Sequence, residues 1–211
     1  MPLNSEGGAR SILKEKSRLR FPSIPPARSQ TFFMMSSEQA PCQQPQDKSD
    51  YFIKPVTTPD DLTSTIALFR EYAASLDTDL SFQDFSSEVA NMPGNYSLPT
   101  GTLLLARTGS GAPVGCVGLR SLDSSETCEM KRLYVSPLGR GRGLGKALAL
   151  EALDQARKLG YRRVRLDTLR SMTSAKALYE KLGFVEVEPY YNNPIEGTRF
   201  LELTLDDGPH G

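Results

Sequence analysis

The order of hydrophobic and polar positions divides the chain into a first segment without a pattern and a long periodic region. Alternating apolar and polar residues predict strands at 51–56, 102–106, 114–119, 128–135, 163–169, 184–187 and 198–205. Apolar residues at helical spacing predict helices at 62–73, 81–92, 143–159 and 174–182. The resulting order, β-α-α-β-β-β-α-β-α-β-β, indicates an α+β (mixed α/β) fold rather than a simple alternation of strands and helices.

Turn and cap residues set the limits of several elements. Pro55 cannot donate a hydrogen bond to a neighbouring strand, so the first strand is expected at an edge of the sheet. Thr58 and Pro59 provide a cap and a first helical proline for the helix that follows. Gly160 ends the long helix that begins near residue 143. The predicted core stripe of this helix consists of Leu144, Leu148, Ala152, Ala156 and Leu159.

Residues 1–50 are rich in Ser, Pro and Gln and lack periodicity, a composition that favours a disordered tail. The folded domain is expected at 51–206, with a short tail at 207–211. The first part of the tail is Arg-rich and poor in acids, as in a mitochondrial transit peptide, and a plain flexible tail is the alternative. We therefore expect a cytoplasmic protein, with mitochondrial import as the alternative. Removal of residues 1–50 is expected to leave fold and activity intact.

Composition excludes several classes of function. The 211 residues are 38% hydrophobic and carry 25 basic and 25 acidic side chains, so bulk attraction to nucleic acid or to an anionic membrane is not expected. No apolar run reaches the roughly eighteen residues of a membrane span, which predicts a soluble protein. The single histidine, His210, leaves Ser-His-Asp and Cys-His catalysis without a base in the folded part, and no cluster of metal ligands is present. An odd number of cysteines, three, indicates reduced residues of an intracellular protein.

A glycine-rich segment after the strand at 128–135 carries the clearest functional signal. Its glycines permit positive φ and close approach of the backbone to a ligand, and they stand at positions 139, 141, 143 and 145. Free N–H groups at the start of the next helix, together with Arg140, Arg142 and Lys146, form an anion site, so a ligand that carries phosphate is expected. The segment does not match G-x-G-x-x-G, and Ala147 stands where a P-loop needs Ser or Thr. A P-loop nucleotide hydrolase is therefore a weak alternative.

The pattern Arg140-x-x-Gly143-x-Gly145, directly after a strand and at the start of a helix, resembles the acyl-CoA pyrophosphate loop of the GNAT superfamily of N-acetyltransferases. Residues 128–135 and 175–184 also resemble motifs of this family, in the same order and spacing. The resemblance implies a central mixed, mostly antiparallel sheet with helices on both faces. It also implies that acetyl-CoA is the co-substrate. The residues expected to bind it are Leu133, Tyr134, Val135, Arg140, Gly141, Arg142, Gly143, Leu144, Gly145 and Lys146.

Tyr179 lies in the run A-x-x-L-Y-E-K-x-G-F, a position that favours it as the general acid. A phenol with a pKa of about 10 stays protonated at rest and can give its proton to a departing thiolate. A core tyrosine is the structural alternative. Where the family often has Asn, this chain has Met172, so one side-chain contact to the cofactor arm is missing.

Glu129 stands at the position of the general-base glutamate in the family's histone-acetylating branch. A base near the bound amine is useful because lysine-like amines titrate near pH 10. Strand alternation is expected to place Glu129 on one face with Lys131 and Leu133, and a surface ion pair is the structural alternative. The expected mechanism is direct attack of the amine on the thioester in a ternary complex.

The acceptor is the least determined part of the prediction. Carboxylates that could attract a cationic amine are Glu71, Asp84, Glu129 and Asp167. The segment at 190–193, Tyr-Tyr-Asn-Asn, could form a wall of the acceptor pocket, which suits a small polar amine or amino acid. A protein lysine or N-terminus is the alternative acceptor, and a non-catalytic acyl-CoA-binding module is the alternative function. The sequence leaves a homodimer open.

Overall fold

The computed structural model of the protein describes residues 51–76, 83–122 and 124–205. The predictions for residues 1–50, for the start of the second helix at 81–82 and for 206–211 lie outside the described residues. The order of strands and helices in the described part is the predicted one. The strands are β1 (Tyr51–Pro55), β2 (Thr102–Thr108), β3 (Pro113–Ser121), β4 (Thr127–Val135), β5 (Arg163–Thr168), β6 (Val185–Val187) and β7 (Arg199–Thr204).

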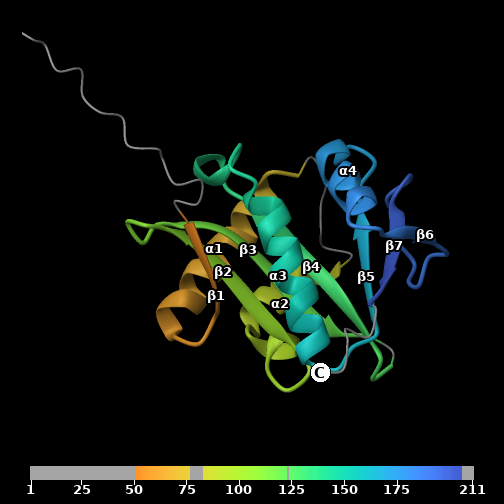
Figure 1. Cartoon of the computed structure of the whole chain (residues 1–211), viewed down its shortest axis with the longest axis horizontal. Coiled ribbons are helices and arrows are strands. Elements are labelled where there is room, and N and C mark those ends of the chain that lie inside the picture. The colour runs from red at the N-terminus through yellow and green to blue at the C-terminus, as the bar shows by residue number, and fades with distance from the viewer. Residues whose placement is uncertain (1–50, 77–82, 123, 206–211) are drawn as a thin grey trace, which may run out of the picture. The chain divides into compact units, whose positions relative to one another are not determined.

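These strands form one sheet in the order β1-β2-β3-β4-β5-β7-β6 (Figure 1). Every neighbouring pair is antiparallel except β4 and β5, which are parallel. β1 occupies an edge of the described sheet, as Pro55 predicted, because among the described residues it pairs with β2 alone. The expectation of a mixed, mostly antiparallel sheet is therefore confirmed.

Helices cover both faces of this sheet, which was also expected (Figure 1). One face carries α1 (Pro59–Ala74), α2 (Phe85–Ala90) and the 3-10 helix η2 (Gly94–Tyr96), and the other carries α3 (Leu144–Lys158) and α4 (Thr173–Lys181). The predicted stripe of α3 packs on the sheet: Leu144, Leu148, Ala152 and Ala156 are fully buried, and Leu159 is partly buried. The α1 side has its own cluster, formed by Leu68, Phe69, Tyr96, Leu103, Leu105, Cys116 and Tyr134.

A β-bulge in β4 changes which side chains face which helices. Gly118 pairs with Lys131, whereas Cys116 pairs with Tyr134, so β4 has one more residue than β3 between these pairs. The extra residue is Arg132, whose φ of 57° lies in the left-handed region. As a result Lys131 and Arg132 both lie on the α1 side. The expectation that Leu133 shares this face is wrong, because Leu133 packs into the cluster on the α3 side.

The parallel strands β4 and β5 are joined only at their beginnings. The last residue pair between them is Glu129 with Arg165. Beyond it, the described part of β4 pairs with β3 alone and that of β5 with β7 alone. The two strands therefore separate toward the end of β4, next to the 3-10 helix η3 (Pro137–Gly139) and the start of α3.

We expect Gly118→Ala to destabilise the protein by about 1–3 kcal/mol, as overpacking does in other cores. A Cβ atom at this position would lie 2.6 Å from Cε1 of the buried Tyr96 ring, whose edge packs on Phe69. Gly109→Ala is the matched control, because a Cβ atom there would meet nothing within 4 Å. Urea denaturation of both variants measures the difference. Equal stabilities would show that Tyr96 moves aside without cost.

Candidate active site

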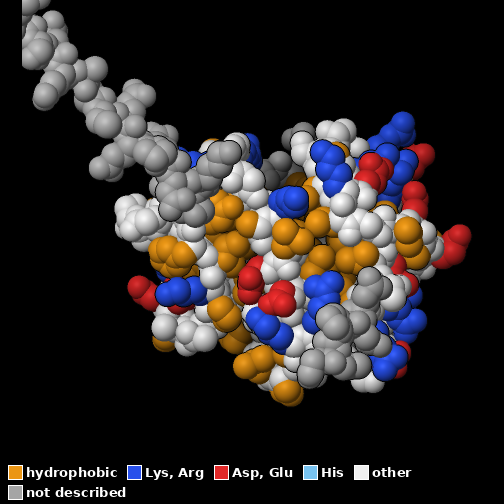
Figure 2. Space-filling view, in the orientation of Figure 1, with side chains coloured by type: hydrophobic (Ala, Val, Ile, Leu, Met, Phe, Trp, Pro, Cys, Tyr) orange, Lys and Arg blue, Asp and Glu red, His pale blue; other side chains and the backbone are white. Residues whose placement is uncertain are grey.

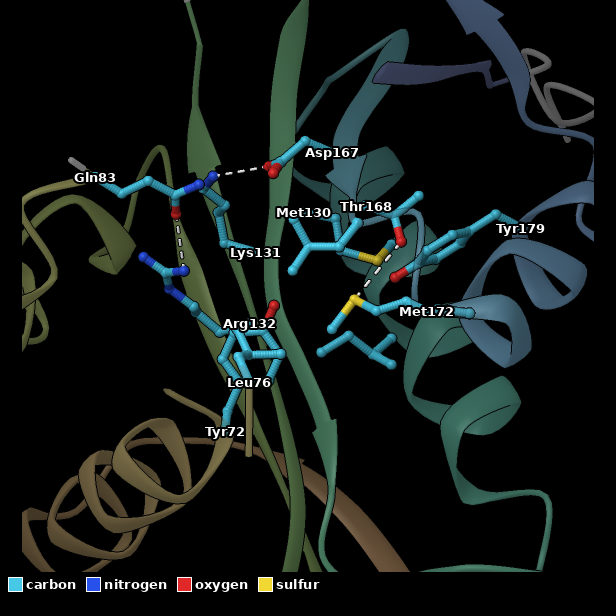
Figure 3. Close-up of a pocket in the computed structure, with 13 residues that line it drawn as sticks. Tyr72, Leu76, Gln83, Met130, Lys131, Arg132, Asp167, Thr168, Met172 and Tyr179 are labelled. Carbon is cyan, nitrogen blue, oxygen red and sulfur yellow. Dashed lines mark hydrogen bonds and ion pairs between the residues drawn. The ribbon is translucent and has the colours of Figure 1, made fainter. Parts of the chain in front are cut away.

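A cavity of about 50 Å³ lies where β4 and β5 separate (Figure 3). It is lined by Tyr72, Leu76, Gln83, Met130, Lys131, Arg132, Leu133, Asp167, Thr168, Leu169, Met172, Ala175 and Tyr179. These residues come from α1, β4, β5 and α4 and from the segments next to them, so the cavity is lined from both faces of the sheet. The gap between β4 and β5 thus brings side chains from the α1 side of the sheet together with side chains of α4.

Tyr179 enters the cavity from α4. Its ring is 6% exposed and packs edge-on against Phe184, at 5.4 Å between ring centroids. Its hydroxyl points into the cavity (Figure 3). Burial, followed by the nearby Tyr72 and then the charge of Asp167, raises the pKa of Tyr179 well above its ordinary value. The hydroxyl therefore keeps its proton at neutral pH, as a proton donor must.

Met172 occupies the start of α4 and also lines the cavity. Thr168 Oγ1 donates a hydrogen bond to Met172 Sδ at 3.7 Å. Met172 stands where the family often has a cofactor-binding Asn. Its thioether lies in the cavity wall, and the Thr168 hydroxyl holds it in place.

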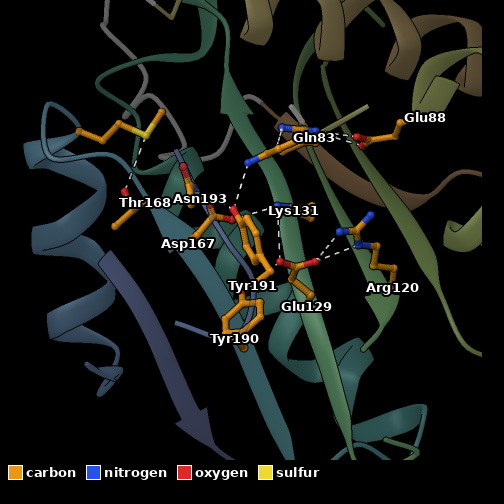
Figure 4. A network of polar contacts seen from close by, with 12 residues as sticks. Gln83, Glu88, Arg120, Glu129, Lys131, Asp167, Thr168, Tyr190, Tyr191 and Asn193 are labelled. Atoms are coloured by element: carbon orange, nitrogen blue, oxygen red, sulfur yellow. Dashed lines mark hydrogen bonds and ion pairs between the residues drawn. The ribbon is translucent and has the colours of Figure 1, made fainter. Parts of the chain in front are cut away.

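Glu129 does not belong to the cavity wall, and its carboxylate is only 1% exposed. Its Oε2 accepts hydrogen bonds from Arg120 Nε at 2.9 Å and Nη2 at 2.7 Å. Its Oε1 accepts the Tyr190 hydroxyl at 2.9 Å and lies 3.4 Å from Lys131 Nζ (Figure 4). Both oxygens are thus engaged by groups of the protein, and the pairing is buried rather than at the surface.

Asp167 and Lys131 line the cavity on the α1 side, with Asp167 Oδ1 2.9 Å from Lys131 Nζ. The ammonium group of Lys131 also lies 5.4 Å from the centre of the Tyr191 ring. The Tyr191 hydroxyl accepts hydrogen bonds from Gln83 Nε2 at 3.1 Å and from Asn193 Nδ2 at 3.0 Å (Figure 4). The segment expected to form a wall of the acceptor pocket therefore reaches this cluster. Sequence reasoning missed Gln83, since no motif surrounds it.

Arg132 is the other buried cation of the bulge, and sequence reasoning also missed it. Its Nη2 and Nε contact the two oxygens of Glu88 at 2.6 Å and 3.2 Å, and its Nη1 donates to Gln83 Oε1 at 2.9 Å. Burial alone would raise the pKa of Glu88, but hydrogen bonds from Arg132 and Tyr96 and the charge of Arg132 lower it overall. Arg132 therefore fastens α2 to β4 and fixes one border of the cavity.

The glycine-rich segment leads from the end of β4 into α3, beside the cavity. Gly141 and Gly143 have φ values of 76° and 75°, in the left-handed region that favours glycine. Gly139 serves close packing instead, because a Cβ atom there would lie 2.9 Å from the Val114 carbonyl oxygen. Gly143 caps α3 without a side-chain hydrogen bond, so the first N–H groups of the helix face the segment. Arg140 Nε donates to the Val135 carbonyl oxygen at 3.3 Å and thereby ties the segment to β4.

In residues 51–76, 83–122 and 124–205, no group of three or more His, Cys, Asp or Glu side chains is placed to hold a metal ion. The same part of the chain contains no helix long and apolar enough to cross a membrane.

Comparison with known proteins agrees with this geometry. A sequence model described as the acetyltransferase (GNAT) family matches residues 64–184. An uncharacterized N-acetyltransferase of Schizosaccharomyces pombe is 40% identical over 157 residues, which span 74% of this chain and 96% of that protein.

Solved structures share the fold. A Klebsiella pneumoniae protein described as an acyl-CoA N-acyltransferase aligns with a TM-score of 0.59 at 27% identity, over 74% of this chain and 97% of that one. A Salmonella typhimurium protein, described as an acetyltransferase and solved with its cofactor acetyl-CoA, aligns with a TM-score of 0.56 at 19% identity, over 76% of this chain and 97% of that one.

Proposed function

The chain belongs to the GNAT family of acetyltransferases, and we propose that it moves an acetyl group from acetyl-CoA to a primary amine by direct attack in a ternary complex. The observation that carries this proposal is the cavity between the separated strands, with Tyr179 in its wall. Residues of both faces line the cavity, so the proposal brings the thioester and the amine together at the gap between β4 and β5.

The residues beside the cavity fit the chemistry of acetyl-CoA. The open N–H groups at the start of α3, with Arg140, Arg142 and Lys146 close in sequence, suit the pyrophosphate. Leu133–Val135 follow the last β4–β5 pair, so the backbone edge of β4 that faces the gap can bond the pantetheine amides. Figure 2 shows hydrophobic side chains gathered between α3 and α4, with Lys or Arg side chains beside them. These features support the proposed residues of the acetyl-CoA site.

Tyr179 is proposed as the general acid. Acetyl-CoA supplies a thioester whose carbonyl carbon is open to an amine. As the new C–N bond forms, the C–S bond breaks, and the Tyr179 hydroxyl gives its proton to the departing sulfur. The sequence-based prediction of Glu129 as the general base rests on the family resemblance, and Asp167 competes with Glu129 for this role.

A small polar amine or amino acid is the proposed acceptor. The cavity is narrow, and Tyr72, Leu76 and Gln83 border it on the side opposite α4. The neighbouring Tyr191 and Asn193 add aromatic and amide groups. These groups are suited to the recognition of a compact polar molecule. Acetylation of free amines, compared with that of peptides with a lysine or a free N-terminus, tests this choice.

A free-thiol assay with a panel of amines tests the function itself. We expect at least one primary amine to stimulate the release of CoA and to yield an acetylated product that mass spectrometry detects. Tight acetyl-CoA binding with no stimulated release across a broad panel would instead support a non-catalytic acyl-CoA-binding module. Stabilisation by ATP and magnesium in place of CoA, measured by thermal shift, would support the nucleotide hydrolase.

A further inference from the structure

Two carboxylates, the buried Glu129 and the partly exposed Asp167, lie near the gap between β4 and β5. Glu129 belongs to the last residue pair that joins the strands, whereas Asp167 lies two residues beyond its partner Arg165. Asp167 lines the cavity and is 11% exposed, whereas Glu129 is outside the cavity wall and 1% exposed. Asp167 is therefore the carboxylate that an acceptor in the cavity meets.

We propose that Asp167 contacts the acceptor amine and takes its proton, and that Lys131 and Tyr191 are positioning residues for Asp167. The inference rests on the acetyltransferase function proposed above and deepens it. Glu129, in turn, holds Lys131 and Arg120 in place. It is a positioning residue that acts through Lys131 and does not touch the acceptor.

The hydrogen bonds of the two carboxylates support a direct role for Asp167 and a positioning role for Glu129. Arg120, Lys131 and Tyr190 engage both oxygens of Glu129. Asp167 Oδ1 accepts one hydrogen bond from Lys131 Nζ. A carboxylate has about four lone-pair directions, so Asp167 retains capacity for a further donor such as an amine N–H.

Tyr191 is placed to orient Asp167. Its oxygen accepts two N–H groups, from Gln83 and Asn193, so its own hydrogen points to neither of them. The Asp167 carboxylate lies near enough to act on this hydroxyl. Burial, followed by the charge of Asp167, raises the pKa of Tyr191, which keeps this hydroxyl protonated at neutral pH. Lys131 thus holds the Asp167 carboxylate by a direct ion pair, and the Tyr191 ring lies beside the same ammonium group.

Asp167 and Tyr179 lie on opposite sides of the sheet, which fits an acetyl transfer in which one group takes a proton and the other gives one. Asp167 contacts Lys131 on the α1 side, whereas Tyr179 packs in the cluster on the α3 side. Both side chains line the same cavity. The amine would lose a proton to Asp167 on one side of the thioester while the sulfur receives the Tyr179 proton on the other. The Asp167 proton then passes to water, and Tyr179 is reprotonated from water.

The charge environment of Asp167 comes from several elements. The titratable groups that face it or act on it are Tyr72 of α1, Glu129 and Lys131 of β4, Tyr179 of α4, and Tyr190 and Tyr191 of the segment between β6 and β7. Lys131 is shared between the two carboxylates, and Arg120 offsets the charge of Glu129.

The test compares pH profiles of kcat for the full-length wild type and three variants with an amine that the wild type acetylates. We expect Asp167→Asn to lower kcat about 10²–10³-fold near neutral pH, within the range for loss of a general base. The loss should shrink as the pH approaches the pKa of the amine, about 10 for a lysine-like group. Tyr191→Phe should lower kcat less, with the same pH dependence, while Glu129→Gln should cause a loss that is equal at every pH.

Asp154→Asn is the matched control, because Asp154 lies on the outer side of α3 in an exposed pair with Lys158. It should leave the profile unchanged. Thermal melts and acetyl-CoA titrations confirm that each variant folds and binds. Wild-type activity in Asp167→Asn, or pH rescue in Glu129→Gln alone, would overturn the inference. A wild type that acetylates no amine would instead defeat the proposed function.

Discussion

Tyr179→Phe is expected to lower kcat by roughly 10²–10⁴-fold, the range for the loss of one general acid. The substitution keeps the ring and its edge contact with Phe184, so the core on the α3 side stays packed. Only the proton donor is removed from the cavity. Acetyl-CoA affinity should therefore remain nearly intact, and the melting temperature should hardly change. Single-turnover measurements at saturating acetyl-CoA report the chemical step.

Tyr161→Phe provides the matched control for this prediction. Tyr161 is also buried, and its hydroxyl donates to the Thr100 carbonyl oxygen at 2.6 Å, away from the cavity wall. Its loss should lower stability by about 1 kcal/mol, the usual net value of a hydrogen bond, and leave kcat unchanged. If Tyr179→Phe turned over at the wild-type rate with chemistry limiting, the thiolate would depart without this acid. Tyr179 would then be a packing residue.

The longer elements of the fold could be predicted because each one repeats its own hydrophobic pattern over many residues. The stripe of α3 is an example, since its members lie three or four residues apart and all face the same core. The bulge at Arg132 could not be predicted in this way, because it depends on the pairing of β4 with β3. One extra residue reverses the alternation, so the side predicted for Leu133 was wrong although the strand itself was right.

The same distinction between local patterns and long-range pairing applies to the residues of the candidate site. Tyr179 and the glycine-rich segment stand in short motifs, and a local pattern identifies them. The acceptor side is assembled from distant segments: Gln83 and Tyr191 are 108 positions apart, and Tyr190 and Glu129 are 61 apart. The position of Glu129 could be read from the sequence, but its partners could not, since they meet only in the folded chain.

Gly143→Glu is expected to weaken acetyl-CoA binding about 100-fold or more. The new carboxylate would stand at the cap of α3, where the proposed site holds the pyrophosphate. Two like charges about 5 Å apart repel by roughly 3 kcal/mol at an effective dielectric constant of about 20, and each 1.4 kcal/mol is about tenfold in affinity. Titration calorimetry measures the change, and added salt should reduce it because it screens exposed charges.

Gly160→Glu separates this electrostatic effect from backbone strain. Gly143 and Gly160 flank the same helix with φ values of 75° and 86°, and a Cβ atom at either position meets nothing within 4 Å. Both variants should therefore lose stability to a similar extent, about 1–2 kcal/mol for a side chain in the left-handed region. Only Gly143→Glu should lose acetyl-CoA affinity. Equal affinities for the two folded variants would mean that the pyrophosphate binds elsewhere, and the start of α3 would then be no more than a glycine-rich turn.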